Sequence, residues 1–378
     1  MAELSPIFEG ASGDTNSTFE SLVNVFGRML VPGYQDVHKD EAVDGSIREA
    51  LYQRISMIHQ ALAGTSRTIT PLVNQSAAQL ASLAQASVAA RYALVNLNPF
   101  MVSGEGGLYD RFNHQGQLDL FDAQTGQGLT GEYLEARARF LALKNELAVR
   151  DLDRQDTISP DLYGYFEDRG TGVSINNTVP NSAPYRTPSP EYVFGSEQAD
   201  TIDVARDPLN PDAGFDDHVF GGGGNDILRT YAGNDYLEGG PGDDVLDGGV
   251  GDDVMSGGAG VDTYSIQGND HVIDEGRNNI LYNGQLIAGV FMKVDEDTYT
   301  FISDDGSLRP LTFHSPGVLN LGPTDSVTFD RQTSAADFAG QDFGFVLQDE
   351  PPASDLVLNG TQDRDEMGIL NFSSDPAN

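Results

Sequence analysis

The chain has 378 residues, carries a formal net charge of -37 at pH 7 and contains no cysteine. A chain of this length can bury a sizeable core in two or three domains, but so acidic a chain is not drawn to nucleic acid or to an anionic membrane by charge. The lack of cysteine excludes disulfide bonds as a source of stability, and no apolar run reaches the roughly 18 residues that cross a bilayer.

The first 150 residues show the apolar spacing of amphipathic helices. Apolar side chains recur every three or four residues in the segments 19–30, 47–62, 80–95 and 134–148. Ser46 and Glu49 form a capping-box pattern at the start of the second helix, and Pro99 ends the third. The alternating segment 116–127 predicts a short hairpin before the fourth helix. We therefore expect an α-helical domain with a short hairpin over residues 1–150.

This helical half carries no recognisable catalytic motif. The G-x-S-x-G elbow, the H-E-x-x-H zinc motif and the Walker A loop are absent, as is any cysteine nucleophile. His38, His59 and His114 lack metal-ligand spacing, and we interpret them as surface or core residues. We therefore expect this chain alone not to be an enzyme, with a lipase or phospholipase of unrecognised site as the alternative.

A polar, proline-rich stretch follows the helices over residues 151–192 and is typical of a linker or an extended strap. The charge then changes sharply along the chain. Residues 191–270 hold eighteen Asp and Glu against two Lys and Arg, whereas residues 1–100 hold nine against six. Such a shift marks the start of a specialised acidic region.

The acidic region is a repeat of nine residues. Residues 221–265 divide into the units GGGGNDILR, TYAGNDYLE, GGPGDDVLD, GGVGDDVMS and GGAGVDTYS. Position four is always Gly, position six is always Asp, and position eight is apolar or aromatic. Two weaker units, 195–203 and 212–220, precede them and flank an eight-residue insertion. This is the G-G-x-G-x-D-x-U-x nonapeptide of a parallel β-roll, which we place over residues 193–265.

The spacing of the aspartates predicts calcium sites. Two units complete one coil of eighteen residues, so carboxylates eighteen residues apart stack at about 4.8 Å and repel unless a cation lies between them. Ca²⁺ fits better than Mg²⁺, because it accepts six or more carboxylate and carbonyl oxygens in a flexible geometry. The predicted metal-binding residues are Asp217, Asp226, Asp235, Asp244, Asp253 and Asp262, with Gly222, Gly224, Gly233, Gly240, Gly242, Gly249, Gly251 and Gly260 in the turns.

The roll is expected to fold only with metal. A three-residue strand buries too little apolar surface to offset the entropy of ordering it, so metal binding must supply the folding free energy. Extracellular modules bind Ca²⁺ at about 10⁻⁴–10⁻³ M. A segment of this affinity would stay unfolded in a low-calcium cytosol and fold outside the cell, which suits export of an unfolded chain.

The segment after the roll is rich in β-forming runs. We expect residues 266–350 to form an antiparallel β cap over the last coil, since an uncovered edge would template aggregation. Residues 351–378 form a tail in which Gly360 to Asp365 resembles the start of another nonad. The whole chain is therefore predicted to be an α+β multidomain protein: an N-terminal α-helical domain, a parallel β-roll and a C-terminal antiparallel β capping region.

With these nonads, residues 195–265 resemble the RTX (repeats-in-toxin) class of secreted bacterial proteins. The segments 82–104, 116–147 and 192–202 look like the region that joins a lipase or other effector module to its RTX array. The resemblance implies a secreted, extracellular calcium-binding region whose partners are a bacterial secretion system and an effector, toxin or lipase module. It carries the family's calcium ligands onto the six aspartates above but finds no counterpart of a catalytic serine. A calcium-dependent adhesion module stays open as another alternative.

Overall fold

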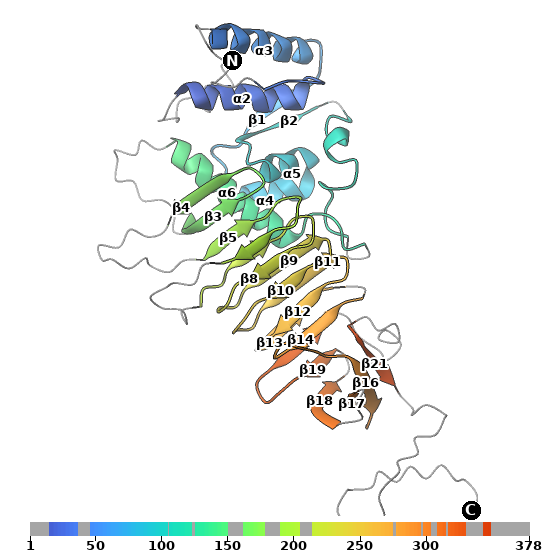
Figure 1. Cartoon of the computed structure of the whole chain (residues 1–378). Helices are drawn as coiled ribbons and strands as arrows, with labels where there is room; N and C mark the ends of the chain where they lie inside the picture. The colour runs from blue at the N-terminus through green and yellow to red at the C-terminus, as the bar shows by residue number, and fades with distance from the viewer. Residues whose placement is uncertain are drawn as a thin grey trace, which may run out of the picture.

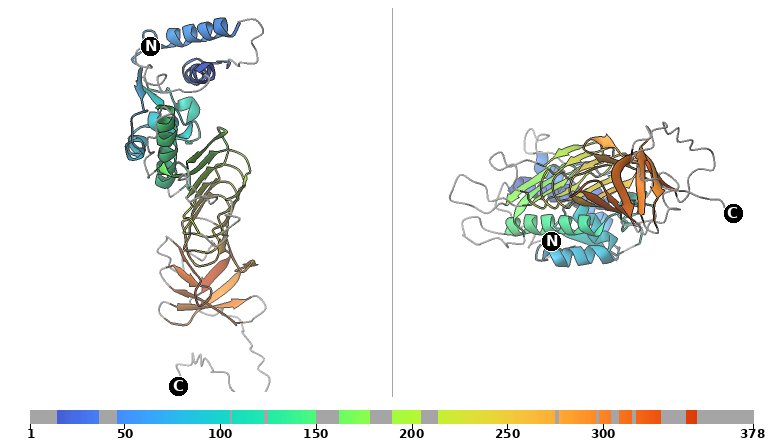
Figure 2. Two further views of the ribbon diagram at one scale, coloured as in Figure 1. Left: turned by 90° about the vertical axis from the view of Figure 1, so that its left-hand side faces the viewer. Right: turned by 90° about the horizontal axis from the view of Figure 1, so that it is seen from below.

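The computed structural model describes the chain between residues 15 and 348 with several gaps. The described residues are 15–36, 46–104, 106–122, 125–149, 162–177, 190–204, 214–274, 277–295, 298–303, 308–314, 317–329 and 343–348. They form an elongated molecule, with helices at one end, short parallel strands in the middle and antiparallel strands at the other end (Figures 1 and 2). The tail with Gly360 lies outside the described residues.

Helices make up most of the described N-terminal region. They are α2 (Thr15–Leu30), α3 (Ser46–Leu62), α4 (Ala77–Ala86), α5 (Val88–Val95), the short 3-10 helix η3 (Asp110–Phe112) and α6 (Gly131–Val149). Strands β1 (Thr68–Pro71) and β2 (Phe100–Ser103) pair antiparallel between them. The hairpin expected over 116–127 is reduced to isolated bridges, one of which joins Asp122 and Gln127. None of the described helices is both long and apolar enough to span a bilayer.

The segment 80–95, expected to belong to one helix, is divided between two helices, α4 and α5. Ser87 separates them with an extended backbone (φ -142°, ψ 122°), and its hydroxyl accepts a hydrogen bond from the N–H of Ala90 as the N-cap of α5. A serine side chain competes in this way with the helical hydrogen bond of its own backbone. The guanidinium of Arg91 donates to the freed carbonyl of Ala84 at 2.8 Å, which stabilises the break.

Helix α6 lies between the other helices and the first strands of the roll (Figure 1). The sequence predicts one buried face with Leu134, Ala138 and Leu141, and these three side chains are fully buried. Phe140 and Leu143, which point elsewhere around the helix, are also fully buried. A helix with buried residues around most of its circumference must pack against neighbours on two sides. Helices α4 and α5 cover one side of α6, and aromatic side chains of the roll cover the other.

Two stacks of short strands wind into the roll. One stack contains β6 (Thr201–Asp203), β8 (Ile227–Arg229), β10 (Val245–Asp247), β12 (Thr263–Ile266), β14 (Asn279–Tyr282) and β15 (Gln285–Leu286). The other contains β5 (Glu191–Phe194), β7 (His218–Phe220), β9 (Tyr236–Pro241), β11 (Val254–Ala259) and β13 (Asn269–Val272). Apart from β14 and β15, which pair antiparallel, the strands in each stack pair parallel. Leu228 pairs with Leu246 and Leu246 with Tyr264, so one coil takes the eighteen residues that the repeat predicts.

The eighth residue of every unit points into the roll. Leu228, Leu237, Leu246, Met255 and Tyr264 are all 0% exposed. They belong to one apolar core that continues through the later strands as far as Leu347. Because side chains alternate along a strand, the residues on either side of each core position face outward.

The stack with β5 is longer than the sequence predicts at its N-terminal end. Strands β3 (Gly164–Asp168) and β4 (Val173–Asn177) lie within the segment 151–192 expected to be a linker, and β3 pairs parallel with β5. The expected linker therefore adds two strands to the sheet. The side chains of β4 are exposed or half-buried at the sheet edge, which accounts for the polar residues of that strand.

The strands after the roll extend the same sheet. They are β16 (Gly289–Lys293), β17 (Thr298–Ser303), β18 (Leu308–His314), β19 (Val318–Asn320), β20 (Ser326–Phe329) and β21 (Phe345–Gln348). Consecutive strands from β16 to β20 pair antiparallel, whereas β20 pairs parallel with β13 and β21 pairs parallel with β16. A continuous core of aromatic side chains, including Phe291, Phe313 and Phe345, joins these strands to the roll.

Candidate metal centres

The sixth-position aspartates form two ladders, one in the turns before each stack of strands. The first ladder is Asp200, Asp226, Asp244, Asp262 and Asn278, and the second is Asp217, Asp235, Asp253 and Asp270. In both, the backbone N–H of one member donates to Oδ1 of the next. The N–H of Asp226, for example, lies 2.7 Å from Oδ1 of Asp244. From the second member of each ladder onward, one side-chain oxygen is therefore used to stack the coils.

The other carboxylate oxygen has no partner in five of these residues. Oδ2 accepts no hydrogen bond and is buried in each of Asp226, Asp235, Asp244, Asp253 and Asp262. These side chains belong to residues that are 2% exposed or less. A buried charged oxygen without a partner costs several kcal/mol. The regular recurrence of this cost indicates that a bound cation offsets it.

Backbone carbonyls complete the surroundings of these oxygens. A Cβ added at Gly239 would overlap Oδ2 of Asp244 and would lie 2.7 Å from the carbonyl oxygen of Gly257 in the next coil. A Cβ at Gly242 would overlap the carbonyl oxygen of Gly224. Only glycine fits such a cradle of oxygens. Carboxylate and carbonyl oxygens without nitrogen or sulfur are the donor set of a hard cation such as Ca²⁺.

The predicted residues fall into these turns with one difference. Asp217 begins the second ladder, where its Oδ1 accepts a hydrogen bond from the N–H of Glu191 at 2.7 Å, but its Oδ2 is not one of the five buried, unpartnered oxygens. The predicted glycines all have positive φ in the same turns: Gly222, Gly224, Gly233, Gly240, Gly242, Gly249, Gly251 and Gly260.

Sequence reasoning missed the last member of each ladder. Asp270 and Asn278 follow Asp253 and Asp262 by 17 and 16 residues, so the nine-residue frame no longer finds them. One signal was present, because Gly268-Asn269-Asp270 repeats the Gly-Asn-Asp of the first two full units. Among the described residues no three His, Asp or Glu side chains converge on one point, and the oxygens that accompany each carboxylate are carbonyls.

The fifth-position residues form two further ladders, which are exposed. The side chain of Asp243 accepts a hydrogen bond from the N–H of Val261 at 2.9 Å, and its own N–H donates to Oδ1 of Asn225 at 3.1 Å. Asn234 accepts in the same way from Asp252. Since the side chains of Asn and Asp both accept a backbone hydrogen bond here, this position needs a side-chain oxygen acceptor and no charge.

Burial changes the acidity of the sixth-position carboxyls. Burial, with a smaller contribution from the neighbouring ladder carboxylates, raises the pKa of Asp244 to about 7 and that of Asp253 to about 8. In the absence of metal, a carboxyl with a raised folded-state pKa contributes stability below its unfolded pKa near 3.8, and this contribution is lost as the pH rises through the folded value.

The metal-free chain should therefore gain β structure as the pH falls from about 8 to about 5, because protonation removes the buried charges of residues such as Asp244 and Asp253. Far-UV circular dichroism of metal-stripped protein measures this change. An identical spectrum at both pH values would show that these carboxyls are not buried as charges in the absence of metal.

One turn contains a conformation that glycine adopts more easily. The second position of the units has positive φ, +101° at Gly222 and +105° at Gly240, and Tyr231 adopts +73° at the same position. For a residue with a side chain this left-handed conformation costs about 1–2 kcal/mol, whereas glycine pays about 0.5–1 kcal/mol in unfolded-state entropy.

Tyr231→Gly should therefore be more stable than Tyr231→Ala, by about 0.5 kcal/mol after both terms are included, because both variants lose the 3.3 Å hydrogen bond from the tyrosine hydroxyl to Asp203 and only alanine keeps the backbone cost. Denaturant unfolding at saturating Ca²⁺ measures the change. Thr230→Gly is the matched control, because Thr230 donates to the carbonyl of Gly248 at 3.0 Å and its φ is not positive. The control should destabilise the protein, and the opposite order would contradict the argument.

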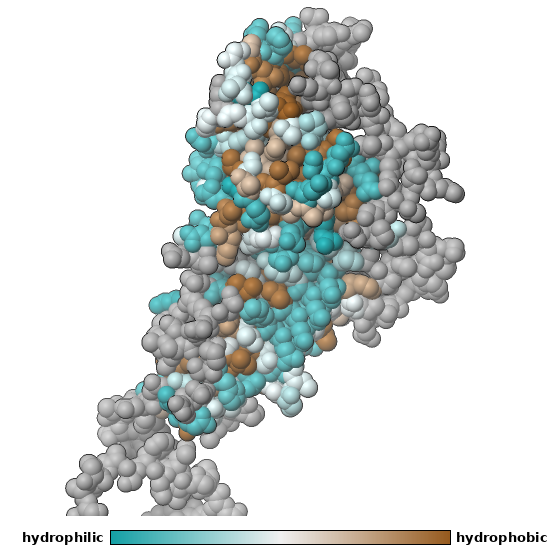
Figure 3. Space-filling model, turned by 180° about the vertical axis from the view of Figure 1, so that it is seen from behind, coloured by the Kyte–Doolittle hydropathy of each residue, from teal (hydrophilic) through white to brown (hydrophobic). Residues whose placement is uncertain are grey.

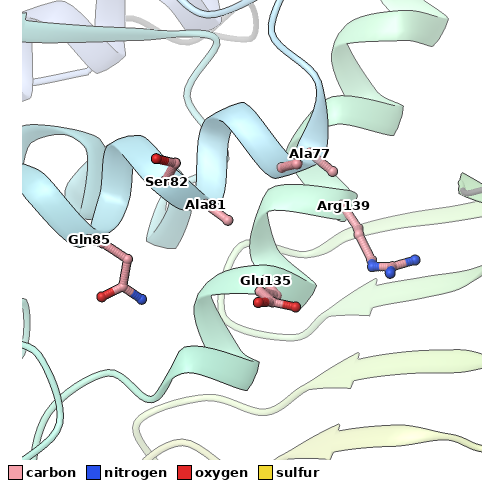
Figure 4. Close-up of a pocket in the computed structure, with 7 residues that line it drawn as sticks. Ala77, Ala81, Ser82, Gln85, Glu135 and Arg139 are labelled. Atoms are coloured by element: carbon pink, nitrogen blue, oxygen red, sulfur yellow. The ribbon is translucent and has the colours of Figure 1, made fainter.

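A groove between α4 and α6 bears on the hydrolase alternative (Figure 4). It has a volume of about 460 Å³ and is lined by Ala77, Ala78, Ala81, Ser82, Gln85, Glu135 and Arg139. The lining contains a hydroxyl but no histidine, so it does not show the nucleophile and base of a serine hydrolase.

The surface over the roll is mostly hydrophilic from behind, whereas hydrophobic patches gather over the helical end (Figure 3).

The comparison with protein families agrees with the turn geometry. A family model of four copies of the RTX calcium-binding nonapeptide repeat matches residues 213–246 and 229–264. No curated protein and no solved structure matches the chain. The matched segments contain the five aspartates whose Oδ2 lacks a partner. The acidic centre of this chain, residues 213–264, is therefore an array of RTX nonapeptide repeats that bind Ca²⁺.

Proposed function

We propose that this chain is the calcium-folded region of a secreted bacterial protein, and that it supports the export and presentation of an effector, toxin or lipase module. The observation that carries the proposal is the set of five buried carboxylate oxygens without hydrogen-bond partners. The ligands of the Ca²⁺ ions would be the sixth-position carboxylates and the backbone carbonyls of the turns. When bound, Ca²⁺ supplies positive charge between coils that otherwise repel, so folding waits for a calcium-rich compartment.

The helical end supports a role in presentation. Tyr133 of α6 packs edge-to-face against Phe194 and Phe220, with ring centroids 5.6 Å and 5.4 Å apart. Arg137 of α6 forms a buried ion pair with Asp168 of β3 at 2.7 Å. We infer that the helices form an N-terminal region docked on the outer face of the roll. Folding of the roll would then stabilise the helices that pack on it.

The later strands support a role as a cap. Strand β20 covers the edge of β13, the last strand of its stack, with Asn269 opposite Ser326. Antiparallel strands then continue the sheet to β16. We infer that residues 266–350 close the C-terminal end of the roll, since an open edge after β13 would offer unpaired backbone groups to other chains.

A comparison of two metal ions tests this function. Titration with Ca²⁺ should produce a cooperative gain of β signal at about 10⁻⁴–10⁻³ M, followed by far-UV circular dichroism. The same titration with Mg²⁺ should produce little change, because Mg²⁺ retains its waters and demands a tighter octahedron. Full β signal in the presence of a chelator at neutral pH would refute the proposal.

A further inference from the structure

Each aspartate of a ladder, together with its turn, is called a rung here. The first rung of the first ladder, that of Asp200, differs from the rungs that follow it. Oδ2 of Asp200 accepts hydrogen bonds from the N–H of Ser196 at 2.7 Å and from its hydroxyl at 2.8 Å. Oδ1 of Asp200 lies 3.4 Å from Nη1 of Arg169. In the next rung, Oδ2 of Asp226 accepts no hydrogen bond. The protein therefore satisfies Asp200 with its own groups.

The second position of the unit explains the first of these contacts. In the next rung this position is Gly222, whose φ is +101° and whose N–H donates to the carbonyl of Gly239 in the following coil. The first unit has Ser196 instead, and its φ is not positive. The backbone N–H and the hydroxyl of Ser196 are both directed at Asp200, so this turn closes on its own carboxylate.

Arg169 is held in place beside Asp200. It follows β3, and its N–H donates to the carbonyl of Phe194 at 2.9 Å. Its Nη1 also donates to the carbonyl of Thr201 at 2.8 Å, and its Nε donates to Oε1 of Glu167 at 3.2 Å. The side chain is 31% exposed. A guanidinium fixed by these contacts puts a permanent positive charge at the first rung.

We propose that Arg169 is a built-in cation of the roll, which together with Ser196 satisfies the carboxylate of Asp200, so that the first rung holds no Ca²⁺ and the calcium sites of this ladder begin at Asp226. The inference rests on the proposed function of the later rungs. It assigns the start of the roll, from β3 to β6, to a part that needs no metal and onto which calcium-bound coils stack.

The acidity of the two rungs supports this assignment. Burial acts to raise the pKa of Asp200, but the hydrogen bonds from Ser196 and the charge of Arg169 outweigh it and hold the pKa below its usual value. Burial raises the pKa of Asp226 to about 6. Compared with an exposed carboxyl, the fold therefore stabilises the charged form of Asp200 and destabilises that of Asp226.

The far end of the roll is also completed by the protein. Oδ2 of Asp270 accepts a hydrogen bond from the N–H of Gln267 at 3.1 Å. In the first ladder, the neutral side chain of Asn278 takes the place of the next aspartate and accepts from the N–H of Asp262 at 2.8 Å. The unpartnered carboxylate oxygens of the first ladder thus lie between two ends that require no cation, and the second ladder has such an end at Asp270.

A double-mutant cycle on the full chain tests the role of Arg169. The variants are Arg169→Ala, Asp200→Ala and the two combined, and Asp226→Ala serves as the comparison for a calcium-binding rung. Arg229→Ala is the matched arginine control, because Arg229 forms a similar 3.4 Å pair with Asp203 in the neighbouring strand, outside the ladders. Equilibrium dialysis gives the Ca²⁺ bound per chain, and circular dichroism gives the Ca²⁺ midpoint of folding.

Arg169→Ala and Asp200→Ala should bind as much Ca²⁺ as the unmodified chain, whereas Asp226→Ala should bind less. Arg169→Ala should raise the calcium midpoint about two- to fivefold, the size expected for a half-exposed ion pair. This rise should disappear when Asp200 is already alanine, because coupled residues are not additive. Arg229→Ala should leave the midpoint within about twofold of the unmodified chain.

Three results would overturn the assignment: loss of bound Ca²⁺ in Asp200→Ala, an unchanged midpoint in Arg169→Ala, or an equal effect of Arg169→Ala with and without Asp200. The proposed function fails separately. If Asp226→Ala also keeps all of its Ca²⁺, the ladders themselves do not bind the metal. Spectra at saturating Ca²⁺ establish that each variant folds.

Discussion

Asp244→Asn should raise the calcium concentration needed for folding at least tenfold, whereas Asp243→Asn should leave it nearly unchanged. The two residues are adjacent in the same turn, and both side chains accept a backbone hydrogen bond from another coil. They differ in burial, because Asp244 is 1% exposed and Asp243 is exposed. The comparison therefore isolates the buried charge.

The size of the effect follows from what the substitution removes. Asparagine at 244 keeps Oδ1 for the N–H of Asp226 but puts an amide donor where the unpartnered Oδ2 of Asp244 lies. Removal of one partner from a buried charge interaction costs about 3–5 kcal/mol. Asparagine at position 243 repeats what Asn225 does in the same ladder and what Asn234 does in the other one, and an exposed substitution of this kind changes stability by no more than about 0.5 kcal/mol.

Calcium titrations of both variants, followed by circular dichroism and equilibrium dialysis, measure the difference. Asp244→Asn should also bind less Ca²⁺ per chain at saturation. Equal midpoints for the two variants would show that charge at the sixth position does not hold the coils together, and the assignment of the ladders as calcium sites would be wrong.

Removal of calcium should release helix α6 together with the roll. The core that buries α6 contains Tyr192, Phe194 and Phe220, which project from the outer face of β5 and β7. Thr130, at the start of α6, donates to the half-buried carboxylate of Glu238 on β9 at 2.6 Å. When the roll expands, these partners separate, and α6 loses one of its two packed sides.

Hydrogen exchange with and without a chelator measures this coupling. Amides of α6 should lose protection along with those of β7 to β12, whereas amides of α2 should keep it. Helix α2 is the internal control, because Phe26 and Met29 pack in a separate core with Phe100 and Tyr92. Unchanged protection of α6 would show that residues 1–150 fold independently of the roll.

The coupling bears on how the chain is divided. The sequence predicts a helical domain, a linker and a roll as separate parts, since their compositions differ. The buried pair of Arg137 and Asp168 joins α6 to β3, within the expected linker. The composition of a segment mainly reflects its solvent-facing residues. A domain boundary depends instead on which segments share a hydrophobic core. The shared core is a contact between segments far apart in the sequence.

The helices also show what a local sequence pattern predicts and what it misses. Spacing of apolar residues correctly places α2, α3 and α6, because amphipathic periodicity is a local property. It does not find the break at Ser87, where a hydroxyl caps α5. It also assigns one buried face to α6, although Phe140 and Leu143 are buried as well.

Sequence alone determined the repeat of nine, the inward direction of the eighth residue, the stacking of the sixth and the choice of Ca²⁺, because each follows from local geometry repeated at a fixed period. Tertiary structure alone decided where the stack begins and ends. Arg169 and Asn278 lie outside the nine-residue frame, and Asp200 belongs to it yet is satisfied by Ser196 and Arg169. Whether a buried carboxylate needs a metal depends on which other groups the fold brings to it, and a periodic pattern contains no information about those groups.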